Sequence, residues 1–191
     1  MALQMTTIQS ELHTETAVLD ELIQRVAAQD SEALTELYHR TSPAIYGYAL
    51  SILKNTHDAE DVLHDSFLRI YSAAVSYKSN GKPMAWFLTI TRNLCLQVLR
   101  EQKRTVDIPA EDWEPYLEAK EGLSAEDRLV LKGCMDLLSA KDREIIILHA
   151  VAGFKHREIA HLLKMPLSTV LSKYHRAIKK LNTYLTQGGQ K

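Results

Sequence analysis

The chain is poor in the residues that make tight turns and in those that cross-link a fold. Its 191 residues include seven Gly and five Pro, too few for an all-β protein built on many tight hairpins. Two cysteines, Cys95 and Cys134, lie far apart without metal-like spacing. We expect each to be a buried free thiol, which fits a cytoplasmic compartment. No apolar run reaches the roughly 18 residues of a membrane span, so we expect no membrane insertion.

Positive charge is missing from the N-terminus. Residues 1–20 carry Glu11, Glu15 and Asp20 but no Lys or Arg, which does not resemble the basic start of a signal peptide. We expect residues 1–17 to form an N-terminal tail whose first dozen residues are loose. Hydrophobic residues make up 46% of the chain, with three Phe and two Trp, so packed cores should form and be mainly aliphatic.

The net charge of −1 conceals four blocks of alternating sign. Residues 1–65 carry three Lys or Arg and eleven Asp or Glu, and residues 66–104 carry seven and one. Residues 105–127 then carry one and eight, and residues 128–191 carry twelve and four. Charge runs are often only solvated faces. Two basic blocks separated by an acidic segment nevertheless indicate two basic surfaces and an acidic surface for another partner.

Helical spacing of apolar residues dominates on both sides of that acidic segment, and β-type alternation is absent. We predict an all-α protein of two small helical domains, 18–104 and 125–186, joined by an acidic linker over 105–124 and followed by a C-terminal tail at 187–191. In the first domain a helix with Leu19, Leu22, Ile23 and Val26 on one face precedes a second that begins at Asp30–Ser31.

Proline and small polar residues set the expected helix boundaries. Ser42 with Pro43 predicts the start of a further helix, because proline suits the first helical position. Thr56 or Asp58 is expected to cap a helix over 59–74. Its buried side would hold Leu63, Phe67, Ile70 and Ala74, and that of a helix over 84–103 would hold Phe87, Ile90, Leu94 and Val98. Helices over 125–138 and 140–151 should follow the linker.

Residues 154–181 have the pattern of a helix-turn-helix. Pro166 interrupts a short helix, and Ser168 or Thr169 can cap the next one. One side of that second helix is apolar, with Val170, Tyr174, Ala177, Ile178 and Leu181. The other side carries Thr169, Ser172, Lys173, Arg176, Lys179 and Lys180, the hydroxyls and cations that a DNA groove accepts. An ordinary helical hairpin with a solvated basic face is the alternative.

Two helices of the first domain carry further polar surfaces. The helix over 59–74 presents Glu60, Asp61 and Asp65 beside an exposed Leu68 and Arg69, with Asp58 just ahead. Its first turn favours carboxylates through the helix dipole, but Asp65 lies beyond that turn, so a protein-binding patch is plausible.

The helix over 84–103 presents Trp86, Thr89, Arg92, Asn93, Leu96 and Arg100 opposite its core stripe. An aromatic ring among cations suits single-stranded nucleic acid, although a single Trp is commonly a core residue.

Catalytic or metal-binding patterns are weak. His57, Asp61 and His64 form a poor ligand pattern, and no Gly-rich elbow supports a Ser nucleophile. We expect no enzyme activity, cofactor or metal.

Four motifs in order, residues 58–71, 85–94, 138–144 and 154–181, resemble the bacterial sigma-70 superfamily, specifically its extracytoplasmic-function (ECF) group. The resemblance covers roughly residues 18–185 and implies a sigma factor with domains 2 and 4 that directs RNA polymerase to promoters and melts the −10 region. It implies core RNA polymerase (β′ clamp helices and β flap), promoter DNA and an anti-sigma factor as partners.

The resemblance also implies site residues by position. The polymerase-binding residues would be Asp58, Glu60, Asp61, Asp65, Leu68 and Arg69. The −10 residues would be Ser79, Asn80, Lys82, Trp86, Arg92, Asn93 and Arg100. The −35 residues would be Lys155, Arg157, Ser168, Thr169, Ser172, Lys173 and Arg176. The acidic linker would lie along the route of nascent RNA.

Two other classes of protein remain open on the sequence. A conventional helix-turn-helix regulator would bind an operator without polymerase. An adaptor that docks proteins through both domains would show no salt-dependent affinity for nucleic acid.

Overall fold

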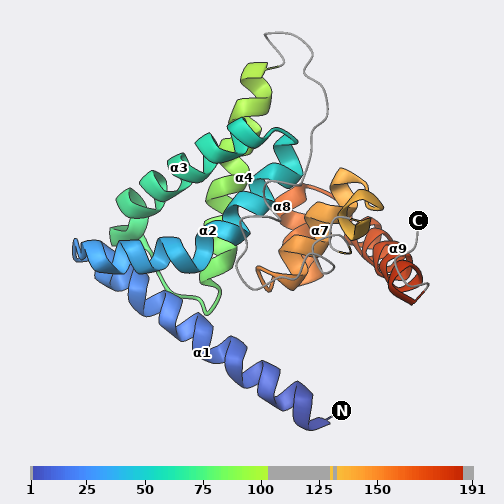
Figure 1. The fold of residues 1–191 in the computed structure, drawn as a ribbon, viewed down its shortest axis with the longest axis horizontal. Coiled ribbons are helices and arrows are strands. Elements are labelled where there is room, and N and C mark those ends of the chain that lie inside the picture. The colour runs from blue at the N-terminus through green and yellow to red at the C-terminus, as the bar shows by residue number, and fades with distance from the viewer. Residues whose placement is uncertain (1, 103–129, 131–132, 187–191) are drawn as a thin grey trace.

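A computed structural model describes residues 2–102, 130 and 133–186, with side chains from residue 14 onward. All regular elements in this part of the chain are helices, which confirms the all-α prediction (Figure 1). The acidic linker, the start of the helix expected over 125–138 and the C-terminal tail lie outside the described residues. Residues 133–136 of that expected helix are helical. Across the described ranges, no helix is long and apolar enough to span a membrane.

The N-terminal half consists of α1 (Ala2–Ala27), α2 (Ser31–Leu53), α3 (Thr56–Ala73), the short 3₁₀ helix η1 (Ala74–Ser76) and α4 (Pro83–Gln102). The predicted core face of α1 is confirmed, since Leu19, Leu22, Ile23 and Val26 are all buried. The loose start expected within residues 1–17 is wrong for the backbone, because α1 begins at Ala2. No Gly or Pro interrupts the helix there.

Helix α2 continues through Pro43, so the predicted new helix at Ser42–Pro43 is wrong. Its start is as predicted, because Asp30 Oδ1 accepts the N–H groups of Glu32 and Ala33 at 3.0 and 3.1 Å. Leu37 and Ile45 are buried on either side of the proline. Packing of both turns against one core therefore outweighs the hydrogen bond that proline cannot donate.

The cap of α3 is Asn55, not Thr56 or Asp58, and its Oδ1 accepts the N–H of Asp58 at 3.0 Å. Phe67, Ile70 and Ala74 are buried as predicted, whereas Leu63 is half-buried.

The buried face of α4 is rotated from the predicted stripe. Phe87 is buried, but Ile90, Leu94 and Val98 are half-buried, and Leu88, Thr91 and Cys95 take the interior positions. Small residues of α3 allow this close approach, since the Ser66 hydroxyl donates to Thr91 Oγ1 at 3.2 Å. Burial raises the pKa of the free thiol of Cys95 to about 12. Cys134 is also free but only half-buried, short of the burial expected for both thiols.

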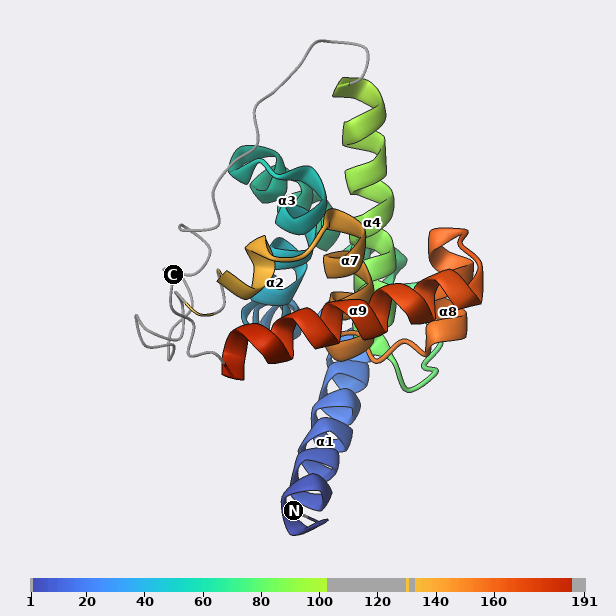
Figure 2. The ribbon, with the colours of Figure 1, turned by 90° about the vertical axis from the view of Figure 1, so that its right-hand side faces the viewer.

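The C-terminal half consists of α7 (Ala140–Ala150), α8 (His156–Leu163) and α9 (Leu167–Thr186). Figure 2 shows α9 lying across α7 and α8. Lys164 takes a left-handed conformation (φ 53°) and closes α8, and α9 begins directly after Pro166. Ser168 and Thr169 thus lie inside the first turn of α9, so the prediction that one of them caps it is wrong. The carbonyl oxygen of Pro166 accepts the N–H groups of Thr169 and Val170 at 3.0 and 3.1 Å, so the helix starts without a side-chain cap.

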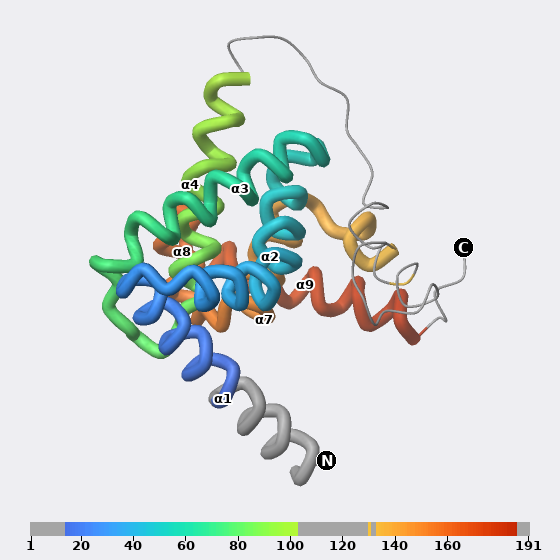
Figure 3. Tube along the Cα trace, turned by 60° about the vertical axis from the view of Figure 1, so that its left-hand side comes forward, coloured from blue at the N-terminus to red at the C-terminus, as the bar shows by residue number. Residues whose placement is uncertain are grey.

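The two halves pack against each other. Helix α7 contacts α2, and buried side chains of both halves form one continuous cluster that includes Tyr48, Phe87, Leu148 and Ile159. The tube in Figure 3 shows α7 beside α2. Segments of the two expected domains are therefore neighbours in this structure.

Candidate nucleic-acid interface

The loop between η1 and α4 is held to α1. Asp20 accepts the hydroxyl of Tyr77 at 2.5 Å through Oδ1 and that of Ser79 at 2.6 Å through Oδ2. Burial, followed by this carboxylate, raises the pKa of Tyr77. Asn80 Oδ1 accepts the N–H of Lys82 at 3.1 Å, and Gly81 between them has φ +71°, where a side chain would be strained. Contacts within the chain thus hold this loop against α1.

Trp86 packs at the edge of the core. Its ring lies 4.6 Å from that of Tyr77 and 5.4 Å from that of Phe87, at tilts of 46° and 47°. The half-buried indole keeps one part accessible next to the loop. Further along α4, Asn93 and Arg100 are exposed.

Lys82 and Arg92, two of the cations implied for −10 DNA, are paired with carboxylates of the other half. Lys82 Nζ donates to Glu158 at 2.6 and 2.8 Å, and Arg92 Nε donates to Glu144 at 2.9 Å. Glu158 lies in the first turn of α8 and Glu144 lies in α7. Sequence reasoning missed these partners, although both belong to the four carboxylates of the strongly basic C-terminal block.

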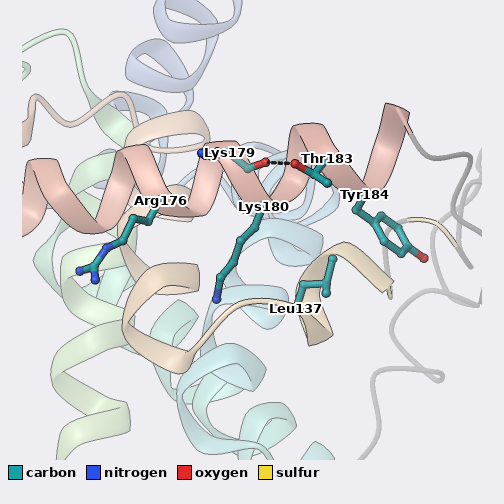
Figure 4. Close-up of a pocket in the computed structure, with 6 residues that line it drawn as sticks. All are labelled: Leu137, Arg176, Lys179, Lys180, Thr183 and Tyr184. Atoms are coloured by element: carbon teal, nitrogen blue, oxygen red, sulfur yellow. Dashed lines mark hydrogen bonds between the residues drawn. The ribbon is translucent and has the colours of Figure 1, made fainter.

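Most of the predicted polar side of helix α9, in contrast, faces solvent. Ser168, Ser172, Arg176, Lys179 and Lys180 are exposed, while Val170 and Ala177 are buried on the other side of the helix. A hollow of about 500 Å³ lies beside the end of this face, lined by Arg176, Lys179, Lys180, Thr183, Tyr184 and Leu137 (Figure 4). The predicted two-sided helix is confirmed for these residues, whereas Thr169, expected on the polar side, is half-buried.

Lys173 differs from its neighbours on α9. Its Nζ donates to Asp142 Oδ1 at 3.1 Å, and both side chains are largely covered. Burial opposes ionisation of Asp142, but hydrogen bonds from Ser139 and Lys173 outweigh it and lower the pKa of the carboxyl. Lys155 and Arg157, at the start of α8, are exposed.

Rings fix α8 against α9. The imidazoles of His149 and His156 stack at 4.5 Å, and Tyr174 of α9 meets both edge-on at 5.0 and 4.6 Å. His149 Nδ1 lies 2.8 Å from the Phe154 carbonyl oxygen. This cluster joins α7, α8 and α9 through one group of ring contacts.

The acidic surface of α3 is open to solvent. Glu60, Asp61, Asp65 and Arg69 are exposed, and Leu68 is 56% exposed. Asp58 instead accepts the Gln102 side-chain amide at 2.6 Å. Tyr71 and Val75 extend the exposed apolar strip from Leu68. Sequence reasoning missed these two, although Tyr71 lies three residues after Leu68 on the same side of α3; Val75 follows in η1.

Among the described side chains, no three His, Cys, Asp or Glu residues are grouped to hold a metal ion.

Comparison with known proteins identifies the family to which both halves of the chain belong. The Sigma-70 region 2 family model matches residues 37–105, and the Sigma-70 region 4 model matches residues 117–181. The chain belongs to the ECF group of the sigma-70 family. It is an RNA polymerase sigma factor, as the sequence motifs predicted, and this family is non-catalytic.

Curated relatives match this sigma factor over most of their length. The ECF RNA polymerase sigma factor SigK of Mycobacterium sp. (strain KMS) is 28% identical over 177 residues, covering 89% of this chain and 92% of the relative. SigK of Mycobacterium bovis (strain BCG / Pasteur 1173P2) is 28% identical over 174 residues, covering 87% and 93%.

Two solved complexes share its fold. The sigma factor RpoE bound to the anti-sigma factor NepR from Bartonella quintana has a TM-score of 0.59 at 25% identity, covering 80% of this chain and 96% of that one. CnrH in complex with the cytosolic domain of CnrY has a TM-score of 0.54 at 22% identity, covering 90% and 99%, which supports the fold alone.

Proposed function

We propose that this sigma factor binds core RNA polymerase through the acidic surface of α3, docks α9 on the −35 element and captures the melted −10 strand with the 79–82 loop and α4. The observation that carries this proposal is the separation of the surfaces. The exposed carboxylates of α3 and the exposed cations of α9 belong to different halves of the molecule. Polymerase and duplex DNA can therefore bind without competing for the same side chains.

Sigma factors are non-catalytic, so the free energy that opens the DNA strands would come from binding. Unstacking a base costs a few kcal/mol, and stacking a base on an aromatic ring returns about 1–3 kcal/mol. Trp86, next to a loop already held by Asp20, suits this role because little conformational entropy remains to be lost. The exposed Asn93 and Arg100 would contact the same strand along α4.

On α9, Arg176 and Ser172 would enter the major groove, with Ser168 and Thr169 at its N-terminal end. Lys155 and Arg157 at the start of α8 would contact phosphates, which position the helix without reading sequence. The β flap of polymerase is a further expected partner of this half. RpoE was solved in complex with the anti-sigma factor NepR, which supports an anti-sigma factor for this chain as well.

Run-off transcription with core polymerase tests the proposal. We expect the purified chain to direct transcription from promoters of its host, and Asp61→Arg to weaken core polymerase binding by about 100-fold, because a reversed interface charge costs several kcal/mol. Glu36→Arg, a reversal of the same size on an exposed residue of α2, is the matched control. Normal polymerase binding by Asp61→Arg would remove the assignment of the α3 surface. Tight operator binding without any polymerase dependence would favour a conventional regulator.

A further inference from the structure

Two cations that the proposed function assigns to −10 DNA contact carboxylates of region 4. The cations Lys82 and Arg92 lie on region 2, and the carboxylates that contact them, Glu158 and Glu144, lie 76 and 52 residues further along the chain. A carboxylate and a phosphate offer the same charge and similar acceptor oxygens to Lys and Arg. Each carboxylate thus takes up donors that the cation would need in order to bind a strand phosphate.

The Arg92 contact is the more enclosed one. The side chains of Arg92 and Glu144 are 11% and 6% exposed. Glu144 also accepts from Lys141 Nζ at 2.8 Å, and the hydroxyl of Tyr48 lies 3.5 Å from its Oε1. DNA cannot approach the Arg92 guanidinium while this arrangement persists.

The Lys82 contact lies nearer to solvent, at 26% and 42% exposure. Glu158 serves two groups at once, since it also accepts the backbone N–H of Lys155 at 2.6 Å in a capping box. The bonds from Lys82 and from Lys155 lower the pKa of this carboxyl, so it is charged at neutral pH. An exposed ion pair is weak and screened by salt, so this end of the interface can open.

We propose that region 4 closes over the −10 face of region 2, with Glu158 on Lys82 and Glu144 on Arg92, and that it must move away before the −10 strand can bind. The inference rests on the proposed function, because it takes Lys82 and Arg92 as nucleic-acid contacts. Continuous apolar packing between the halves supports a closed state of the isolated protein. The apparent affinity for the strand is then the intrinsic affinity multiplied by the fraction of open molecules.

Two variants test this proposal: one removes the carboxylate charges of region 4 at the interface, and the other removes the cations of region 2. In the full chain, E144Q/E158Q removes the two carboxylate charges, while the amide oxygen introduced at position 158 can still cap α8. K82Q/R92Q removes the two cations. Both variants should open the interface, seen as a larger radius of gyration in small-angle X-ray scattering.

The same two variants should differ in binding a short fluorescein-labelled oligo(dT), followed by anisotropy. We expect E144Q/E158Q to bind about 10-fold more tightly, because the cations are uncovered. K82Q/R92Q should bind more weakly than the parent although it is equally open. E32Q/E36Q, two exposed residues of α2, is the matched control for charge and should change neither measurement.

Each other outcome has a definite meaning. An unchanged radius of gyration in both variants overturns the closed state. If both variants open but K82Q/R92Q binds oligo(dT) as well as the parent, the closed state stands and the assignment of these cations to −10 DNA fails. If E144Q/E158Q loses helicity by circular dichroism, K82Q/R92Q tests closure alone, and an unchanged radius of gyration in it overturns the proposal.

Discussion

The two cationic surfaces of this sigma factor differ in what they face. On α9, Arg176, Lys179 and Lys180 are exposed along one side of the helix, whereas Lys82 and Arg92 of region 2 are paired with carboxylates of α8 and α7. Cations that face solvent carry little desolvation free energy and have no carboxylate partner to exchange before they contact duplex DNA. Cations enclosed against carboxylates must exchange partners first, so similar residue types in one chain can differ in availability.

The largest expected effect is on stability. Arg92→Met leaves Glu144 buried with Lys141 as its remaining close cation, and should lower the free energy of unfolding by about 2 kcal/mol. The same substitution at the exposed Arg176 should change it by less than about 0.5 kcal/mol. Urea denaturation followed by circular dichroism measures both. Equal losses of unfolding free energy would mean that the cations of the two surfaces contribute equally to stability.

The next effect distinguishes residues within α9. Arg176→Ala should weaken binding to a duplex −35 element by about 10-fold, since one groove contact is worth about 1–3 kcal/mol. Lys173→Ala should weaken it by no more than about 3-fold, because DNA must replace the Asp142 contact that Lys173 already has. Fluorescence anisotropy over a range of salt concentrations measures both, with polymerase binding as the folding control. A larger loss for Lys173→Ala would contradict this ranking.

The smallest effect concerns the rings that hold α8 against α9. Burial, followed by nearby His149 and His175, lowers the pKa of His156 below its ordinary value. The unfolded chain therefore takes up this proton more readily, and stability is lost as pH falls below about 6.5.

We expect the melting temperature to fall less between about pH 7.5 and 5.5 in His156→Gln than in the parent chain. His161→Gln, an exposed histidine on the same helix, should behave as the parent does. If the parent and His156→Gln lose stability in parallel, His156 does not contribute to the acid sensitivity.

Local sequence signals were reliable for several local features, although the caps of α3 and α9 were placed wrongly. The apolar face of α1, the Asp30 cap and the two-sided α9 were predictable, because residues three and four apart share a helical face and a cap acts within one turn. The same signals failed at Pro43, where burial of Leu37 and Ile45 carries α2 through a residue that usually interrupts a helix. They also misplaced the stripe of α4, because the close approach of Ser66 to Thr91 turned that helix.

The sequence by itself determined that this protein is helical, that its charge lies in separate blocks and that its motifs are those of a sigma factor. Only the tertiary structure paired Lys82 with Glu158 and Arg92 with Glu144. The physical reason is the separation along the sequence of the residues that interact. Helix faces follow from a repeat of 3.6 residues, which any short window of sequence contains, whereas an ion pair between distant segments depends on how whole helices pack.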